Sequence, residues 1–333
     1  MTTESPWPSL DGGAWAHVRN DDVALAPGIQ LICQKHGLDV GAPDSASGSA
    51  VDWAPQRFST GSLPVYALGP DHVLKLFPPD EFAFYCTEVA ALRAVAAQLD
   101  IPTPKVLFAD QHFGWPYILM TRCLGEPMRT AAARIERASL QSLMHQLGRT
   151  LAQLHAVPVR EKASRQGGAV PNDWSSFVAE QRRTAVERQR AHGLPSHWLD
   201  QIPAFLSRVT DDDLGHDRVL LHTEVMREHV LVDQVDGHWR CTGLIDFEPA
   251  MIGPAIYDFA SVGLFVTETD RGLFDAVLDG YGQTERGPSW SVRCFACVLL
   301  HRYSNLPWYL ERSPPPDDAR TLDDLADWWF GHS

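Results

Sequence analysis

The sequence predicts an α+β protein of two lobes, in which a β-rich first half precedes a mainly helical second half. The chain has 333 residues, and at about 150 residues per domain this length fits two domains or one large two-lobed unit. Strand-like patterns surround one helical pattern between 64 and 122, and helical patterns dominate from Leu140. Hydrophobic residues make up 44% and charged residues 21%, which is ordinary globular composition and excludes disorder of the whole chain.

The first predicted elements follow a linker. Residues 41–52, GAPDSASGSAVD, are small and polar, as in a flexible connection after a short N-terminal segment. The next apolar segments, PVYAL and HVLKLF, lie within 64–77 and are separated by Gly69-Pro70-Asp71. Two β-type segments around a turn sequence predict a hairpin.

A helix is predicted after the hairpin, with Asp80 as its N-terminal cap. Pro102 and Pro104 are expected to end it. Spacings of three and four residues define its expected buried face, which is Tyr85, Val89, Leu92, Ala96 and Leu99.

The later elements are predicted in the same way. Strands are expected at 105–108 and 116–122, and a helix at 140–157. β patterns return in RVLL, HVLVD and CTGLI, between 218 and 246, and helices are expected from Tyr257 onward. We therefore predict an N-terminal extension over 1–52, a β-rich N-lobe over 53–122 and a helical C-lobe over 123–333.

Charge and composition exclude several classes of protein. Lys plus Arg number 28 and Asp plus Glu 42, a formal charge of −14, whereas nucleic-acid binding needs a basic surface. No apolar run approaches the ~18 residues of a membrane span, and no signal peptide is visible. Six cysteines show no disulfide or zinc spacing, and Cys294 and Cys297 lie in an apolar run typical of a core. We expect a cytoplasmic protein in a reducing compartment.

The first candidate site is Lys75, in the middle of the apolar segment HVLKLF. Burying an unpaired ammonium is costly, so this lysine needs a partner or a ligand. Glu88, thirteen residues later on the predicted helix, is the candidate partner. The alternative is an edge lysine whose charged end reaches solvent.

The second candidate site combines His222, Glu224 and His229 in LLHTEVMREHVLVD with Asp246 in GLIDFEPAMIG. The predicted order of strands, loop and turn brings the Glu224 loop beside Asp246. Two carboxylates and two imidazoles suit divalent cations and proton transfer. Each histidine taken alone is more often a core or loop residue. Another alternative is a metal site of two histidines and one carboxylate, formed by His222, Glu224 and His229.

The order of these motifs resembles the aminoglycoside phosphotransferase family. The motifs include STGSLPVY, VLKLF, TEVAALRAV, IPTPKVLFA, PYILMTRCLGEPM, LGRTLAQLHAVP, LLHTEVMREHVLVD and LIDFEPAMIGPAIYDFA. The resemblance spans about residues 10 to 310, and within the family the chain looks most like the hygromycin phosphotransferase branch. It implies a protein-kinase-like fold that holds ATP or GTP, with Mg²⁺, between the lobes.

The resemblance also implies roles for single residues. Lys75 would contact nucleotide phosphates and Glu88 would orient it, while Ser62 in STGSLP would lie at the phosphates. The segment 117–123, with Met120 and Cys123, would form the hinge that meets the base. In the C-lobe, His222 and Glu224 would belong to the catalytic loop, Asp246 and His229 would bind metal, and Asp258 would be structural.

Four features depart from the family pattern. Glu224 replaces the catalytic aspartate and carries one more methylene, and ~1 Å displacements can cost ~10²-fold in rate. His229 replaces an asparagine, as in macrolide phosphotransferases, and Thr223 replaces a glycine. The phosphate loop has a single glycine, Gly61. These departures favour, as an alternative function, a kinase-like binding protein with lost or very slow transfer.

The predicted partner is a small-molecule acceptor, and its identity and the oligomeric state stay open. The resemblance implies an aminoglycoside-like or other natural-product hydroxyl, with a cationic acceptor as one option. Acidic residues available for a cationic acceptor are Asp211 to Asp213, Asp317, Asp318, Asp323, Asp324 and Asp327, with Trp308, Tyr309, Trp328 and Trp329 near them in sequence. The alternative for these residues is a solvated acidic surface.

Overall fold

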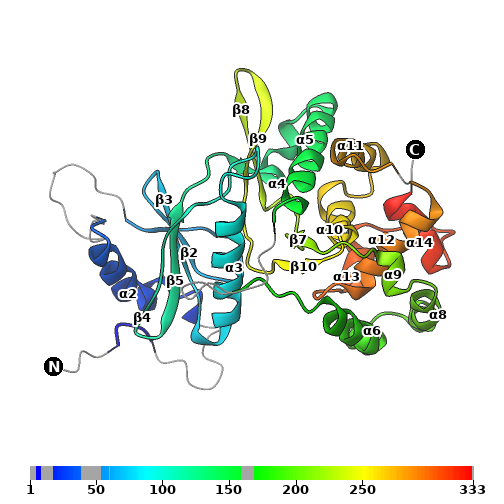
Figure 1. The fold of residues 1–333 in the computed structure, drawn as a ribbon, viewed down its shortest axis with the longest axis horizontal. Coiled ribbons are helices and arrows are strands. Elements are labelled where there is room, and N and C mark those ends of the chain that lie inside the picture. The colour runs from blue at the N-terminus through cyan, green and yellow to red at the C-terminus, as the bar shows by residue number, and fades with distance from the viewer. Residues whose placement is uncertain are drawn as a thin grey trace.

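The chain folds into the two predicted lobes in a computed structural model that describes residues 5–8, 18–38, 54–59, 61–158, 169–284 and 286–331. A sheet-containing N-lobe lies on one side and a helical C-lobe on the other (Figure 1). The predicted linker, 41–52, lies outside the described residues. The predicted division between the lobes at 122 stays a prediction, although the last strand of the large sheet ends at Thr121.

The N-lobe contains a five-stranded antiparallel sheet in the order β1-β2-β3-β5-β4. The predicted hairpin is confirmed, with Val65 opposite Lys75. The strand predicted at 105–108 is longer than expected and runs to His112. The elements are α2 Asp22–Lys35, β1 Gln56–Arg57, β2 Val65–Leu68, β3 His72–Leu76, α3 Phe82–Val95, β4 Val106–His112 and β5 Trp115–Thr121.

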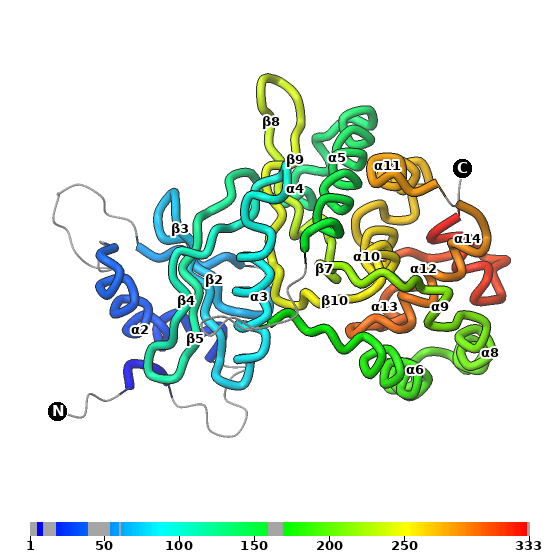
Figure 2. Tube along the Cα trace, in the orientation of Figure 1, coloured from blue at the N-terminus to red at the C-terminus, as the bar shows by residue number. Residues whose placement is uncertain are grey.

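The two faces of this sheet serve different purposes because side chains alternate along each strand. On β3, Leu74 and Leu76 pack with α2 residues on the outer face. Val73 belongs to the core on the α3 side, and Lys75 has the same parity. Helices α2 and α3 therefore lie on opposite sides of the sheet (Figure 2), and Lys75 points toward α3 and the C-lobe.

Helix α3 departs from the prediction at both ends. Asp80 does not cap it, because Asp80 lies inside a short 3₁₀ turn, Pro79–Glu81, and α3 begins at Phe82 with no side-chain cap. The helix ends at Val95, before both prolines, and Ala97 takes a left-handed φ of 58°. Of the expected apolar face, Val89 and Leu92 are buried, whereas Ala96 lies beyond the helix.

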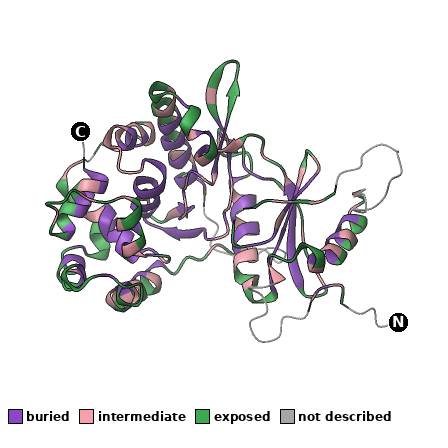
Figure 3. Ribbon diagram, turned by 180° about the vertical axis from the view of Figure 1, so that it is seen from behind, coloured by how far each residue is buried: buried purple, intermediate pink, exposed green. Residues whose placement is uncertain are grey.

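The C-lobe is built around buried helices and short strands, and Figure 3 shows its buried residues gathered in the interior. The helix predicted at 140–157 is α5, shifted by two or three residues. The elements are β6 Glu126–Pro127, α4 Met128–Ala131, α5 Arg137–His155, α6 Trp174–Ala191, α7 Ser196–Leu199, α8 Ile202–Ser207, α9 Asp211–Leu214, β7 Val219–Leu221, β8 Val230–Val235, β9 His238–Leu244, β10 Met251–Gly253, α10 Ile256–Ser261, a π-helical turn Val262–Val266, α11 Arg271–Tyr281, α12 Pro288–Leu300, α13 Leu306–Arg312 and α14 Leu322–Phe330.

Two small antiparallel sheets position the polar motifs. Strand β7 pairs with β10, and β8 pairs with β6 and β9. The loop 222–229 leaves β7 and enters β8, while Asp246 follows the end of β9. The predicted approach of the Glu224 loop to Asp246 is confirmed, because His229 of that loop lies 3.3 Å from Asp246.

Cys294 and Cys297 are fully buried in α12, as the apolar run predicts. All six thiols are free, and burial raises the pKa of Cys297 to about 12. In the part of the chain that the structure describes, no helix combines the length and apolarity needed to cross a bilayer.

Candidate active site

Lys75 joins the two lobes through three carboxylates. Its Nζ lies 2.7 Å from Glu88 Oε2 on α3 and 2.8 Å from Asp246 Oδ1 after β9. Glu248 Oε2, two residues further on, lies 3.2 Å away. The predicted Lys75–Glu88 pair is thus confirmed as a contact, and the alternative of a solvent-reaching lysine is wrong, because Lys75 is only 5% exposed.

Charge holds this buried cluster together. Burial alone would lower the pKa of Lys75, but the carboxylates of Asp246, Glu88 and Glu248 outweigh it and raise that pKa well above its usual value. Burial raises the pKa of Glu88 to about 7 although Lys75 opposes the shift. For Asp246 the balance reverses, since Lys75 and His229 overcome burial and lower its pKa. Asp246 is therefore an anion at neutral pH.

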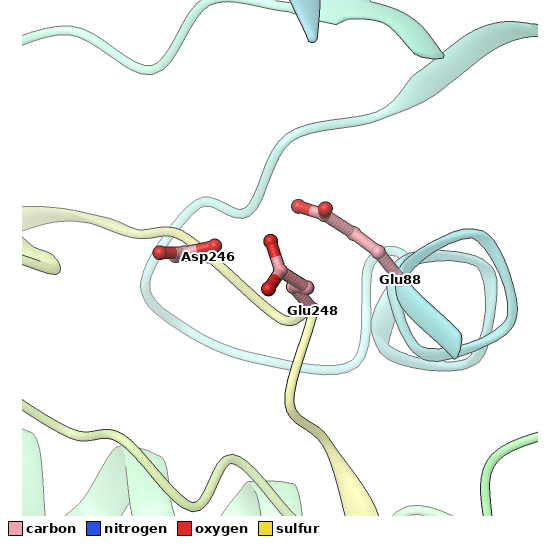
Figure 4. A group of neighbouring side chains, drawn as sticks. All are labelled: Glu88, Asp246 and Glu248. Atoms are coloured by element: carbon pink, nitrogen blue, oxygen red, sulfur yellow. The ribbon is translucent and has the colours of Figure 1, made fainter. Parts of the chain in front are cut away.

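Glu248 is a site residue that the sequence interpretation missed. Glu88, Asp246 and Glu248 offer carboxylate oxygens that all lie within 4.8 Å of one another. Figure 4 shows the three carboxylates converging, with Asp246 and Glu248 on one loop and Glu88 on α3. A second carboxylate two residues after Asp246 was visible in the motif IDFE, but the left-handed φ of 69° at Asp246, which turns both carboxylates toward Lys75, was not.

Residues 222–224 form a loop whose backbone is fixed by distant groups. Thr223 has a left-handed φ of 71°, which is unfavourable for a β-branched residue. Its N–H donates to Asp258 Oδ1 at 2.6 Å, its hydroxyl donates to the Pro249 carbonyl at 3.1 Å, and its carbonyl accepts from His301 Nε2 at 3.0 Å. These three bonds hold the strained conformation.

Asp258 has the structural role that the resemblance implies. Its Oδ2 accepts hydrogen bonds at 3.0 Å from the His222 backbone N–H and from His155 Nε2. Asp258 also bonds Thr223. One buried carboxylate on α10 therefore fixes the start of the 222–229 loop. The position of Glu224 follows from this support.

Glu224 presents a carboxylate beside the charged cluster. Burial raises its pKa to about 7, against the positive influence of His229, and Asp246 and Glu248 add to the rise. Among the described residues, no group donates a hydrogen bond to this carboxylate. An unoccupied carboxylate with a pKa near neutrality can accept a proton from a bound hydroxyl.

The two histidines of the loop have different environments. His222 is fully buried, and burial lowers its pKa to about 4. Its Nε2 donates to the Ile245 carbonyl at 2.9 Å, so it supports the chain before Asp246 instead of facing a ligand. His229 Nδ1 donates to the Glu224 carbonyl at 2.8 Å, which turns Nε2 toward Asp246. His222 therefore supports the loop, and the catalytic role implied for it stays a prediction.

A cavity of about 410 Å³ opens between the lobes beside this cluster, within the usual size range of ligand pockets. Lys75, Glu88, His229, Asp246 and Glu248 line it; His222 and Glu224 do not. Of the residues predicted to bind nucleotide, Ser62, Met120 and Cys123 also line it, as does Gly61.

The predicted hinge segment is only partly at the cavity. Residues 120–123 line it, but Tyr117 does not. Tyr117 and Leu119 face the opposite side of β5, where the Tyr117 hydroxyl lies 2.8 Å from His36 Nε2 of the segment after α2. Strand alternation explains the difference, because Ile118 and Met120 take the α3 side.

The acidic residues considered for a cationic acceptor lie elsewhere. None of them is among the lining residues of the cavity. Asp211, Asp323 and Asp327 pair with arginines at the surface, at 2.9 to 3.1 Å. Asp213 and Asp324 complete capping boxes of α9 and α14. The alternative of a solvated acidic surface is the correct one for these five.

The alternative metal site of two histidines and one carboxylate is not assembled. Within the described ranges, the group of side chains close enough to share an ion is Glu88, Asp246 and Glu248. His222 Nε2 is used by a backbone carbonyl. The carboxylate oxygens of Asp246 and Glu248 are ligands that Mg²⁺ prefers, so the residues present fit that ion.

Comparison with known proteins places the chain among phosphotransferases. It is 27% identical over 188 residues to a viomycin phosphotransferase from Streptomyces vinaceus, covering 52% of this chain and 59% of that protein. It is 25% identical over 215 residues to a lysine-specific demethylase, JMJ21, from Arabidopsis thaliana, covering 54% of this chain and 23% of that protein. The chain thus spans less than two thirds of either relative.

The fold matches a solved structure over most of its length. The GDP complex of wild-type aminoglycoside 2'-phosphotransferase-IIIa superimposes with a TM-score of 0.63 at 16% identity, covering 86% of this chain and 94% of that one. This similarity identifies the kinase-like fold. A family model described as "Phosphotransferase enzyme family" matches residues 56–291, more than half of the chain. The chain therefore belongs to the phosphotransferase enzyme family.

Proposed function

We propose that the protein transfers the γ-phosphate of ATP or GTP, bound with Mg²⁺, to a hydroxyl group of a small natural-product molecule. The observation that carries this proposal is the Lys75–Glu88–Asp246–Glu248 cluster at the cavity between the lobes. A buried ammonium beside carboxylates is the arrangement that holds phosphates and their metal during phosphoryl transfer. The GDP complex named above supports a nucleotide as co-substrate.

In this proposal the apolar lining residues of the cavity bind the base, and the charged lining residues bind the phosphates and the metal. Apolar side chains of Val65, Val73, Met120, Leu231 and Ile245 line one part of it and suit the flat base. Lys75 would bind phosphate oxygens, and Asp246, Glu248 and His229 would hold Mg²⁺, which supplies charge stabilisation to the phosphates. Ser62 and Cys123 lie where they can contact the nucleotide.

The chain's own acid-base group is Glu224. In the proposed step the acceptor oxygen forms a bond to the γ-phosphorus, the bond to the β-phosphate oxygen breaks, and the nucleoside diphosphate leaves. The hydroxyl proton passes to the Glu224 carboxylate. A pKa raised to about 7 by burial suits a proton acceptor near neutral pH. The viomycin phosphotransferase similarity supports a natural product as acceptor.

Calorimetric titration with Mg–ATP and Mg–GTP tests the nucleotide part. Asp246→Asn and Lys75→Met are expected to weaken binding by about tenfold or more, because each removes a charge-assisted contact. Asp246→Asn keeps the shape of the side chain and so separates lost binding from lost folding. Lys35→Met is the matched control, since Lys35 pairs with Asp110 at the exposed surface. Wild-type affinity in both site variants would remove the proposed role of this cluster.

A further inference from the structure

Helix α13 gives the cavity an aromatic and cationic wall. Trp308 and Arg312 line the cavity together with Lys75 and Asp246. They are four positions apart and so share one face of the helix, with the Arg312 guanidinium 5.4 Å from the centre of the Trp308 ring. Glu311, the other charged residue of α13, is not a lining residue.

Two large rings, Trp308 on α13 and Tyr303 just before it, are left partly open to solvent. Trp308 is 40% exposed and Tyr303 46% exposed. Trp308 is supported from behind by Phe265, at a ring-centre distance of 5.6 Å. Burial and then the Glu224 carboxylate raise the pKa of Tyr303, so these two side chains lie within electrostatic range. An exposed ring that lines a cavity, as Trp308 does, can stack on a flat part of a ligand.

Three arginines gather around one carboxylate behind this wall of the cavity. The Glu268 carboxylate pairs with Arg227 at 2.8 Å, with Arg312 at 3.6 Å, and with Arg129. Arg129 also lies 3.0 Å from Glu228, a lining residue. Three guanidinium groups thus share two carboxylates, in a chain with an overall formal charge of −14.

A fourth arginine, Arg302, acts on the proposed proton acceptor. Arg302 lowers the pKa of Glu224, against the larger effect of burial, so its charge is felt at the proposed proton acceptor. Its backbone N–H is fixed by the Tyr257 hydroxyl at 3.1 Å, which locks the start of the segment that carries Tyr303. An ammonium-rich acceptor bound here would face like charges, which disfavour binding.

We propose that the acceptor is a hydroxyl compound with a flat apolar or aromatic part and an anionic group, and not a polycationic amino sugar. The flat part stacks on Trp308, and the anionic group pairs with Arg312, whose planar donors match a carboxylate. This inference rests on the proposed transfer reaction at Glu224. Of the carboxylates that line the cavity, Glu88, Asp246 and Glu248 pair with Lys75, and Glu228 pairs with Arg129.

Three matched ligands test the charge preference. para-Nitrophenyl glucuronide, para-nitrophenyl glucoside and para-nitrophenyl glucosaminide share an aromatic ring and sugar hydroxyls and carry negative, zero and positive charge. In calorimetric titrations of the full chain, the glucuronide is expected to bind about tenfold more tightly than the glucosaminide, as for one charge-assisted contact. Arg312→Gln should reduce that ratio to about threefold or less. Arg208→Gln should leave it unchanged, because Arg208 pairs with Asp323 at the surface.

A second experiment separates the transfer reaction from the charge preference. The same samples are given Mg–ATP or Mg–GTP, and mass spectrometry detects any phosphorylated product. Transfer that is fastest to the glucosaminide or to kanamycin supports the transfer reaction and overturns the charge preference. A charge preference without transfer to any ligand supports the ligand class and counts against the transfer reaction. Equal binding of all three ligands, no binding of any, or an unchanged ratio in Arg312→Gln overturns the inference.

Discussion

Thr223 and Glu224 show how distant contacts determine the geometry of one residue in the site. A left-handed backbone costs a non-glycine residue about 1–2 kcal/mol, and three hydrogen bonds to Asp258, Pro249 and His301 offset that cost. The hydroxyl of Thr223 makes one of these bonds, which a glycine could not. The loop is therefore built for the threonine and holds Glu224 in a defined place.

Substitutions at Glu224 test its role as proton acceptor. Glu224→Gln should abolish transfer while leaving nucleotide affinity unchanged, because the amide keeps the shape but cannot take a proton. Glu224→Asp should lower the rate by roughly 10- to 100-fold, since its carboxylate is withdrawn by about one bond. Initial rates of product formation measure both effects. Glu311→Gln is the control, because Glu311 is an exposed carboxylate on α13. A faster aspartate variant would contradict the assignment.

Glu248 gives a second prediction for a single residue. Glu248→Gln should weaken the binding of the Mg–nucleotide complex about fivefold or more, because a charged oxygen ligand and a partner of Lys75 are lost together. Affinity for the metal-free nucleotide should change less, since the metal contact is then absent in both proteins. Titrations with and without Mg²⁺ compare the two. An equal loss in both titrations would assign Glu248 to Lys75 alone.

The helices and strands show which parts of the fold local sequence can specify. The hairpin at 65–76 and helix α5 follow their apolar periodicity closely. The ends of α3 differ from the prediction, because a 3₁₀ turn at Pro79–Glu81 and the left-handed Ala97 depend on packing around the helix. Periodicity reports which face is buried, whereas end points are decided by contacts that a local pattern does not contain.

Close packing of α5 against α11 depends on glycine. A Cβ at Gly280 would lie 2.1 Å from the His145 carbonyl oxygen, and one at Gly148 would lie 2.0 Å from the Val277 carbonyl oxygen. Gly280→Ala should therefore lower the free energy of unfolding by about 1–3 kcal/mol, as overpacking does. Gly272→Ala is the matched control on the same helix, because its Cβ would meet only side-chain ends, Arg137 Nη2 at 3.0 Å and Asp270 Oδ1 at 3.6 Å, and no backbone. Equal urea midpoints for the two variants would disprove the close contact.

His301, at the end of α12, makes the support of the catalytic loop sensitive to acid. Burial lowers its pKa to about 4, while an unfolded histidine titrates near 6.5. The unfolded chain therefore binds the additional proton first, and the free energy of unfolding falls as pH drops from about 6.5 toward 4, by up to about 1.4 kcal/mol per pH unit for one group. Of its charged neighbours, Arg188 and Arg302 oppose protonation and Asp258 favours it.

The matched variant for this pH effect is His301→Gln, which can still donate to the Thr223 carbonyl. Urea unfolding measures the free energy of unfolding at about pH 7 and about pH 5. Its fall between these two pH values should be larger in the wild type than in the variant, by roughly 1–2 kcal/mol. At neutral pH the His301→Gln variant should keep the activity of the wild type, because the hydrogen bond to Thr223 remains. A wild type and variant with identical pH dependence would show that His301 does not titrate on unfolding.

At the scale of the whole molecule, the site exists because Lys75 of the N-lobe meets Asp246 and Glu248 of the C-lobe. The sequence could predict Lys75, Glu88 and Asp246 as candidates, because a charge in an apolar strand and a motif order are local features. It could not predict that His301 supports Thr223, a contact between residues 78 apart, or that Trp308 and Arg312 of α13 share a cavity with N-lobe strands. The hygromycin phosphotransferase branch stays a prediction.

The central claim is that this cleft transfers a phosphoryl group, and a single mass-spectrometric assay tests it most directly. Purified protein is incubated with Mg–ATP or Mg–GTP and a panel of aminoglycosides, macrolides, viomycin and anionic aromatic glycosides, and both product and nucleoside diphosphate are quantified. We predict an acceptor that gains one phosphoryl group in proportion to diphosphate formed, with product lost in Asp246→Asn and Glu224→Gln but retained in Lys35→Met. Phosphorylated product that persists undiminished in both site variants would contradict the account.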